Sequence, residues 1–72
     1  MFYLVKVGTI TNAQRSKQAL KNRGYKANVS RVEKPKKGDG CGYAVQLDCD
    51  DIDNVIAIIE RENIEVRGVV DL

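Results

Sequence analysis

A basic, glycine-rich segment surrounds the residue of this chain that is best equipped for chemistry. The segment reads Lys-Pro-Lys-Lys-Gly-Asp-Gly-Cys-Gly, and its cysteine is Cys41. The positive charges of Lys36 and Lys37 favour the thiolate form of a nearby thiol. Gly40 and Gly42 allow backbone N–H groups to converge on an anion. Because the thiolate is the nucleophile, we single out Cys41 as a candidate sulfur nucleophile.

Other readings of this segment stay open. Cys41 can equally be a small apolar residue at the start of a strand, with the glycines serving only the turn. The chain contains no histidine, which excludes a Cys–His hydrolase dyad, whereas sulfur transfer or redox chemistry needs no such base. Cys49 lacks basic neighbours and follows Asp48, so we expect a raised pKa and a structural role for it.

The cysteine count limits the classes of protein that remain. The two cysteines lie eight positions apart, without a CxxC pair and without histidine. This pattern argues against a zinc site and against a disulfide-linked secreted scaffold. We expect no metal and no cofactor, no membrane segment or targeting signal, and a cytoplasmic location.

Charge is unevenly distributed along the chain. Residues 1–40 carry ten Lys and Arg against two acids, and residues 41–72 carry two Arg against eight acids. Such asymmetry can indicate an anionic partner for the first half. The simpler interpretation is that the fold interleaves the halves and that most of these charges are solvated.

Hydrophobic periodicity predicts six elements. Strands are expected at residues 2–7, 25–32, 42–48 and 64–70, and helices at residues 11–23 and from about 51 to 63. The order is β-α-β-β-α-β. With right-handed crossovers it predicts one α+β domain over residues 1–72, of ferredoxin-like architecture with a four-stranded antiparallel sheet and two helices on one face.

Local signals place the ends of the first helix. Thr11 and Gln14 have the spacing of a capping box, and Gly24 can adopt the left-handed conformation that ends a helix. The stripe of residues that faces the sheet is thin and comprises Ala13, Ser16 and Leu20.

The second helix has its own signals. Asp50 or Asp51 is expected to cap it and Asn63 to close it. Its inward stripe is apolar at i, i+3, i+4 and i+7 and comprises Ile52, Val55, Ile56 and Ile59.

Strand parity bears on nucleic acid binding. The segments around Tyr3 and Tyr43 loosely resemble the signatures of RNA-recognition motifs, whose aromatic rings stack on bases. An outward Tyr43 would also expose Val45 and Leu47, so we expect Tyr43 in the core and argue against nucleic acid as a partner.

In the last strand, Ile64, Val66 and Val70 are expected to share one face.

Nearly the whole chain resembles a known family of short proteins, the Se/S carrier protein-like family. The most specific feature of the resemblance is the Cys-Gly pair, Cys41 and Gly42, at the head of an apolar strand. Supporting features are the Thr-containing turn before the first helix, Gly24 near its end, and Pro35 followed by Lys36 and Lys37.

The resemblance implies a carrier more than an enzyme. Cys41 would hold sulfur or selenium as a persulfide or selenopersulfide and pass it between donor and acceptor proteins, with Lys36, Lys37, Gly40 and Gly42 supporting it. The alternative is a non-catalytic regulatory or protein-interaction module that uses the open face of the sheet for a homodimer or another protein. The residues expected on that face are Phe2, Leu4, Ala44 and Val69.

Overall fold

The computed structural model describes residues 1–32 and 42–72 and contains the six predicted elements in the predicted order. They are β1 (Phe2–Gly8), α1 (Ile10–Asn22), β2 (Ala27–Val32), β3 (Gly42–Asp48), α2 (Ile52–Arg61) and β4 (Gly68–Asp71). None of the helices in these two ranges is long and apolar enough to cross a bilayer.

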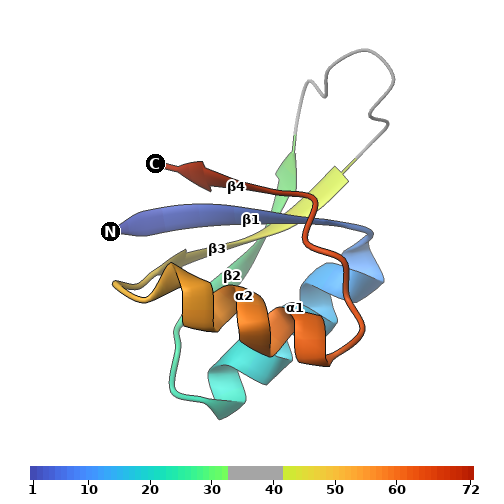
Figure 1. Ribbon diagram of the computed structural model, residues 1–72. Helices are drawn as coiled ribbons and strands as arrows, with labels where there is room; N and C mark the ends of the chain where they lie inside the picture. The colour runs from blue at the N-terminus through green and yellow to red at the C-terminus, as the bar shows by residue number, and fades with distance from the viewer. Residues whose placement is uncertain (33–41) are drawn as a thin grey trace.

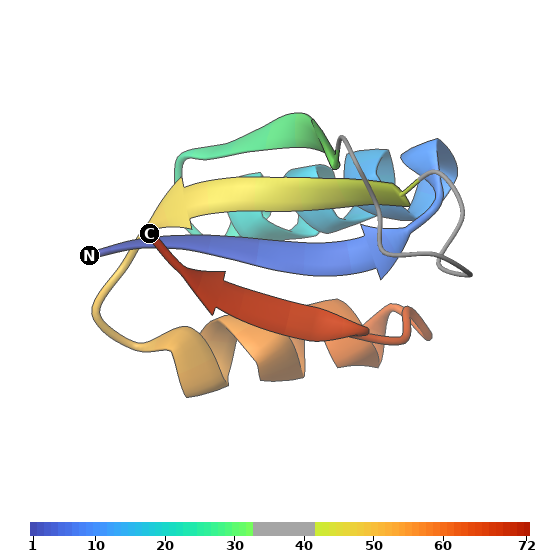
Figure 2. The ribbon, with the colours of Figure 1, turned by 90° about the horizontal axis from the view of Figure 1, so that it is seen from above.

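The strands form one four-stranded sheet in the order β2-β3-β1-β4, and every neighbouring pair is antiparallel. Both helices cover the same face of the sheet and leave the other face open (Figures 1 and 2). This is the ferredoxin-like α+β architecture that the sequence predicts.

The pairing of β1 with β3 fixes which side chains face the helices. Val5 pairs with Val45 and Tyr3 pairs with Leu47, so these positions share the helix-covered face. Between Lys6 and Gly8 the register shifts by one residue, which makes Val7 a β-bulge.

The core lies between the sheet and the two helices. Its fully buried side chains come from β1, α1, β3 and α2 and include Val5, Leu20, Val45 and Ile59. Tyr43 packs against this core, as strand parity predicts. Ala13, Ser16 and Leu20 of α1 are all buried, which confirms the thin inward stripe.

The N-terminal cap of α1 differs from the prediction. Thr9, rather than Thr11, is the N-cap residue, and its side-chain oxygen accepts a hydrogen bond from the backbone N–H of Asn12 at 3.1 Å. Thr11 lies within the first turn and is exposed. Because two threonines stand two positions apart, sequence spacing alone assigned the cap to the wrong one.

The C-terminal ends of both helices follow the prediction. Gly24 has a φ of +91° after α1, and the backbone N–H of Tyr25 donates to the carbonyl of Leu20 at 3.0 Å, which is the Schellman arrangement. Asn63 has a φ of +60° after α2. Asparagine tolerates this conformation better than most residues, so both turns suit their residue types.

Asp51 is the N-cap residue of α2 but makes no capping hydrogen bond with its side chain. The carboxylate instead accepts a hydrogen bond from the hydroxyl of Tyr25 at 2.6 Å, and Asn54 donates to the same hydroxyl at 3.0 Å. This contact links the end of α1 to the beginning of α2. The buried residues of α2 are Val55, Ile58 and Ile59. Ile58 is therefore buried although it was not predicted to face inward, and Ile56, which was predicted to do so, is only partly buried.

The last strand is shorter than predicted and its faces are reversed. It begins at Gly68, while Ile64 and Val66 pack against the core from the preceding segment. Val69 pairs with Val5 and therefore shares the helix-covered face, whereas Val70 pairs with Leu4 and shares the open face. The predictions of Val70 as an inward residue and of Val69 as an open-face residue were wrong, because the strand does not extend back to Ile64 and parity cannot be counted from there.

Candidate functional site

The segment with the candidate nucleophile connects β2 to β3. Val32 and Gly42 pair with each other at the end of the ladder between these strands. Cys41, Lys36, Lys37 and Gly40 belong to residues 33–41 and lie outside the described residues. The structure therefore defines the two strand ends that this segment joins, the end of β2 and the beginning of β3.

Gly42 is the predicted site residue that the structure does describe. It is the first residue of β3 and is partly buried. A Cβ atom added to it would lie 3.8 Å from Cβ of Val32, which is an ordinary van der Waals contact. Neither the space around Gly42 nor its backbone conformation therefore requires a glycine at this position.

Three cationic residues belong to the end of the sheet where β3 begins. Arg31 pairs with Tyr43, and Lys6 pairs with Ala44, so each lies within two residues of Gly42 along the ladders. The backbone N–H of Arg67 donates to the carbonyl of Lys6 at 2.8 Å, which holds Arg67 beside the end of β1. These three residues come from distant parts of the sequence.

The glycine at the end of β1 makes room for Arg67. Gly8 has a φ of +94°, and a Cβ atom added to it would lie only 3.2 Å from Nε of the Arg67 side chain. Gly8 follows the bulge at Val7 and pairs with Tyr43. The bulge and the glycine together let the Arg67 side chain lie against the backbone at the edge where β3 begins.

Cationic residues belong to this end of the sheet, but not to one face of it. Lys6 pairs with Ala44 on the open face, whereas Arg31 pairs with Tyr43 on the helix-covered face. Positive charge at this end of the strands favours an anion such as a thiolate. None of these three residues was a candidate in the sequence. The placement of Lys6 and Arg31 at this end of the sheet could have been found by pairing the predicted strands, whereas the position of Arg67 depends on where the last strand begins, which the sequence pattern misassigned.

Cys49 lies at the opposite end of β3 and is 8 % exposed. Its backbone N–H donates to the carbonyl of Met1 at 2.9 Å. Burial raises the pKa of the Cys49 thiol, and the carboxylate of Asp51 raises it further, although a hydrogen bond from the Asp51 backbone lowers it in part. The predicted structural character of Cys49 agrees with its burial in the core.

Candidate metal ligands are not gathered in the described residues. Within residues 1–32 and 42–72, no three acidic or cysteine side chains lie together in a way that could hold a metal ion.

A family model described as "Putative Se/S carrier protein-like" matches residues 2–71, which is nearly the whole chain. The chain belongs to this family. The matched range runs from the beginning of β1 to the end of β4 and includes the segment with Cys41. A search of curated proteins found no match.

Proposed function

We propose that this member of the Se/S carrier protein-like family carries sulfur or selenium on Cys41 and passes it from a donor protein to an acceptor enzyme. The observation that carries the proposal is membership of the family over residues 2–71. The residue assignment rests on the sequence around Cys41, where Lys36 and Lys37 favour a thiolate, and Gly40 and Gly42 flank it.

The loading step is an exchange at sulfur. The thiolate of Cys41 attacks the outer sulfur of a persulfide on the donor, R–S–SH, and forms a new sulfur–sulfur bond. The old bond breaks and the donor leaves as the thiolate R–S⁻, while the proton stays on the transferred sulfur. Unloading repeats the exchange with a nucleophile of the acceptor, and Cys41 leaves as a thiolate. No external oxidant or reductant is consumed in either step.

The other cysteine is poorly suited to this chemistry. Cys49 is buried and its pKa is raised, so little thiolate forms there and a protein donor cannot reach it. The two cysteines therefore divide into one with basic neighbours in the sequence and one in the core.

The charged edge of the sheet supports the same assignment. Lys6, Arg31 and Arg67 lie at the strand ends next to Gly42, one residue after Cys41 in the chain. A persulfide is more acidic than a thiol, so a positive neighbourhood stabilises the loaded form as an anion. We infer that the positive charge at this end of the sheet favours the anion in both the empty and the loaded carrier.

Intact-mass spectrometry after incubation with glutathione persulfide tests the proposal. We expect a mass increase of one sulfur atom in the wild-type chain and in Cys49→Ala, and no increase in Cys41→Ala. A reductant should remove the added mass. Equal loading of Cys41→Ala and the wild type, or no loading of either, would contradict the assignment of Cys41.

Gly42→Ala adds a test of the neighbouring residue. The added Cβ makes only an ordinary contact with Val32, so the variant should fold with an unchanged melting temperature. If Gly42 gives donors access to Cys41, loading of this variant should be several-fold slower than that of the wild type. Equal rates would remove Gly42 from the site.

A second candidate function is that of a protein-interaction module. Phe2 and Val70 are 51 % and 37 % exposed, and the pairing of Leu4 with Val70 puts them on the open face of the sheet. Ala44 also belongs to this face but is fully buried, so it cannot offer contact area. If the protein is an interaction module, Cys41→Ser should leave partner binding intact, whereas Phe2→Ser should weaken it. A pull-down with each variant measures the difference.

A further inference from the structure

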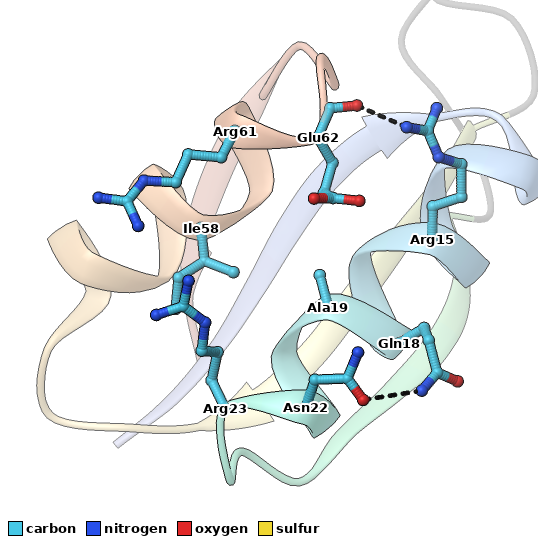
Figure 3. Close-up of a pocket in the computed structure, with 8 residues that line it drawn as sticks. All are labelled: Arg15, Gln18, Ala19, Asn22, Arg23, Ile58, Arg61 and Glu62. Atoms are coloured by element: carbon cyan, nitrogen blue, oxygen red, sulfur yellow. Dashed lines mark hydrogen bonds between the residues drawn. The ribbon is translucent and has the colours of Figure 1, made fainter.

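The helix layer carries a groove that the chemistry of Cys41 does not use. It runs between α1 and α2, has a volume of about 290 Å³, and lies on the side of the molecule away from the open face of the sheet (Figure 3). Its lining consists of Arg15, Gln18, Ala19, Asn22, Arg23, Ile58, Arg61 and Glu62.

The α1 side of the groove is one face of the helix. Its lining residues follow the spacing i, i+3, i+4, i+7 and i+8 from Arg15 to Arg23. At 1.5 Å per residue, the two arginines lie about 12 Å apart along the helix axis. Arg15 and Arg23 therefore mark the two ends of the groove, and Arg61 of α2 lines it from the other side.

The charge of the groove is positive and unbalanced. It contains three guanidinium groups against the single carboxylate of Glu62. In the described part of the chain, no arginine forms an ion pair with a carboxylate. Arg15 is held in place by donating to the backbone carbonyl of Glu62 at 2.7 Å, a bond that leaves most of its N–H groups unused.

The floor of the groove differs from its rim. Ala19 and Ile58 provide an apolar floor, and Gln18 and Asn22 hydrogen-bond each other at 3.1 Å on one wall. An apolar floor between guanidinium groups suits a ligand that alternates carboxylates with an apolar side chain.

The structure points to this groove as a docking site for an acidic segment of a partner protein. Arginine is the residue that best recognises carboxylates, because its planar fork can form two parallel hydrogen bonds. An extended segment rises about 3.3 Å per residue, so two glutamates about four residues apart match the span from Arg15 to Arg23. An aliphatic side chain between them would contact Ala19 and Ile58.

Nucleic acid fits the same groove less well. Binding of single strands relies on aromatic side chains on which bases stack, and no aromatic residue lines the groove. The groove therefore offers charge and an apolar floor but no stacking platform. The inference stands apart from the proposed carrier function, because none of its residues belongs to the Cys41 segment.

An NMR titration of the ¹⁵N-labelled full chain tests the proposal. The probe is a capped peptide with two glutamates four positions apart and a leucine midway between them. We expect saturable shifts of the amide signals of Ala19, Arg23 and Ile58, with the open-face signals of Leu4 and Gln46 unchanged. A lack of saturable shifts in the groove would overturn the proposal.

A matched pair of double variants separates docking from general attraction. Arg23→Gln with Arg61→Gln removes two charges from the groove, and Lys17→Gln with Lys21→Gln removes two from α1 residues that do not line it. We expect the first pair to bind the peptide about tenfold more weakly, because it loses charge-assisted hydrogen bonds to the glutamates. We expect the second pair to change the affinity by about twofold or less, because exposed charges outside the groove are screened by salt. Equal weakening in both would overturn the proposal.

The same titration with an oligothymidylate gives the remaining outcome. We expect it to bind more weakly than the peptide at equal ionic strength. Tighter binding of the oligonucleotide, with shifts of the same groove signals, would replace the acidic protein partner by a nucleic acid.

Discussion

Two buried side chains of this small protein, Cys49 and Ser16, give testable predictions. Cys49 is shielded from reagents. It directly follows β3, at the end opposite to Gly42, and its side chain is buried. Ser16 is a second case of a polar group in an apolar setting. It is fully buried in α1, and within the described residues its hydroxyl has no hydrogen-bond partner.

At Cys49 we predict slow alkylation in the native state. In a Cys41→Ala background, iodoacetamide at neutral pH should modify Cys49 at least about a hundredfold more slowly in buffer than in denaturant, because reaction requires local or global opening. Mass spectrometry of timed samples measures both rates. Comparable rates in the two conditions would show that Cys49 is accessible and that the choice between the cysteines was unfounded.

At Ser16 we predict that alanine stabilises the protein. Ser16→Ala removes an unpaired buried hydroxyl and introduces a better helix former, so the free energy of unfolding should increase by about 1 kcal/mol. Urea denaturation followed by circular dichroism gives the value. Gln14→Ala, an exposed change in the same helix, is the control and should have little effect. A loss of stability in Ser16→Ala would indicate a hydrogen bond to the hydroxyl.

At the scale of elements, the helices are defined by their ends as much as by their stripes. α1 begins at a threonine cap and ends in a glycine turn, while α2 has an apolar stripe and an N-cap carboxylate that bonds to Tyr25 instead of to its own helix. The two helices run antiparallel, and contacts at both ends join them, from Tyr25 to Asp51 and from Arg15 to Glu62.

The cap of α1 gives a prediction with a built-in comparison. Thr9→Ala should lower the free energy of unfolding by about 1 kcal/mol, because the N–H of Asn12 loses its acceptor. Thr11→Ala should have no such effect, since Thr11 is exposed within the first turn. Both values come from chemical denaturation. If Thr11→Ala were the more damaging change, the cap would belong to Thr11 after all.

The order of the six elements could be predicted from the sequence because the signals are local. The alternation in β3, the apolar stripe of α2 and the residues Gly24 and Asn63 each act within a few positions. The face assignments in β4 failed, because Ile64 and Val66 are buried without belonging to the strand. The cations near Gly42 were missed for a related reason, since Arg67 and Arg31 become neighbours of one edge only through long-range pairing.

At the scale of the whole molecule, the groups with perturbed acidity in residues 1–32 and 42–72 act in one direction. The hydrogen bond to Asp51 raises the pKa of Tyr25, burial raises the pKa values of Tyr3 and Cys49, and the hydrogen bond to Asp48 raises the pKa of the α-amino group of Met1. In each case the folded state holds its proton to a higher pH than the unfolded state does.

The melting temperature should therefore fall at alkaline pH. A raised folded-state pKa contributes stability that is present below the unfolded pKa and is lost as the pH rises through the folded value. The decline should begin near pH 8, the ordinary value of the α-amino group, and steepen above pH 10, that of tyrosine. Thermal melts across this range measure it, and Tyr25→Phe should flatten the steep part. A melting temperature that rises with pH would mean that these groups lose their protons more readily in the folded state, the opposite of the expected direction.

The positions of the two chain ends have a practical consequence. Met1 and Leu72 lie side by side, since the N–H of Leu72 donates to the carbonyl of Phe2 at 3.0 Å (Figure 2). Gly42 belongs to the far end of the same strands, where β1 finishes at Gly8. Tethering the chain to a sensor chip or a fluorescent reporter through either terminus thus keeps the anchor remote from the strand ends at Gly42. The loading proposed for Cys41 can therefore be tested on immobilised protein without steric interference from the attachment.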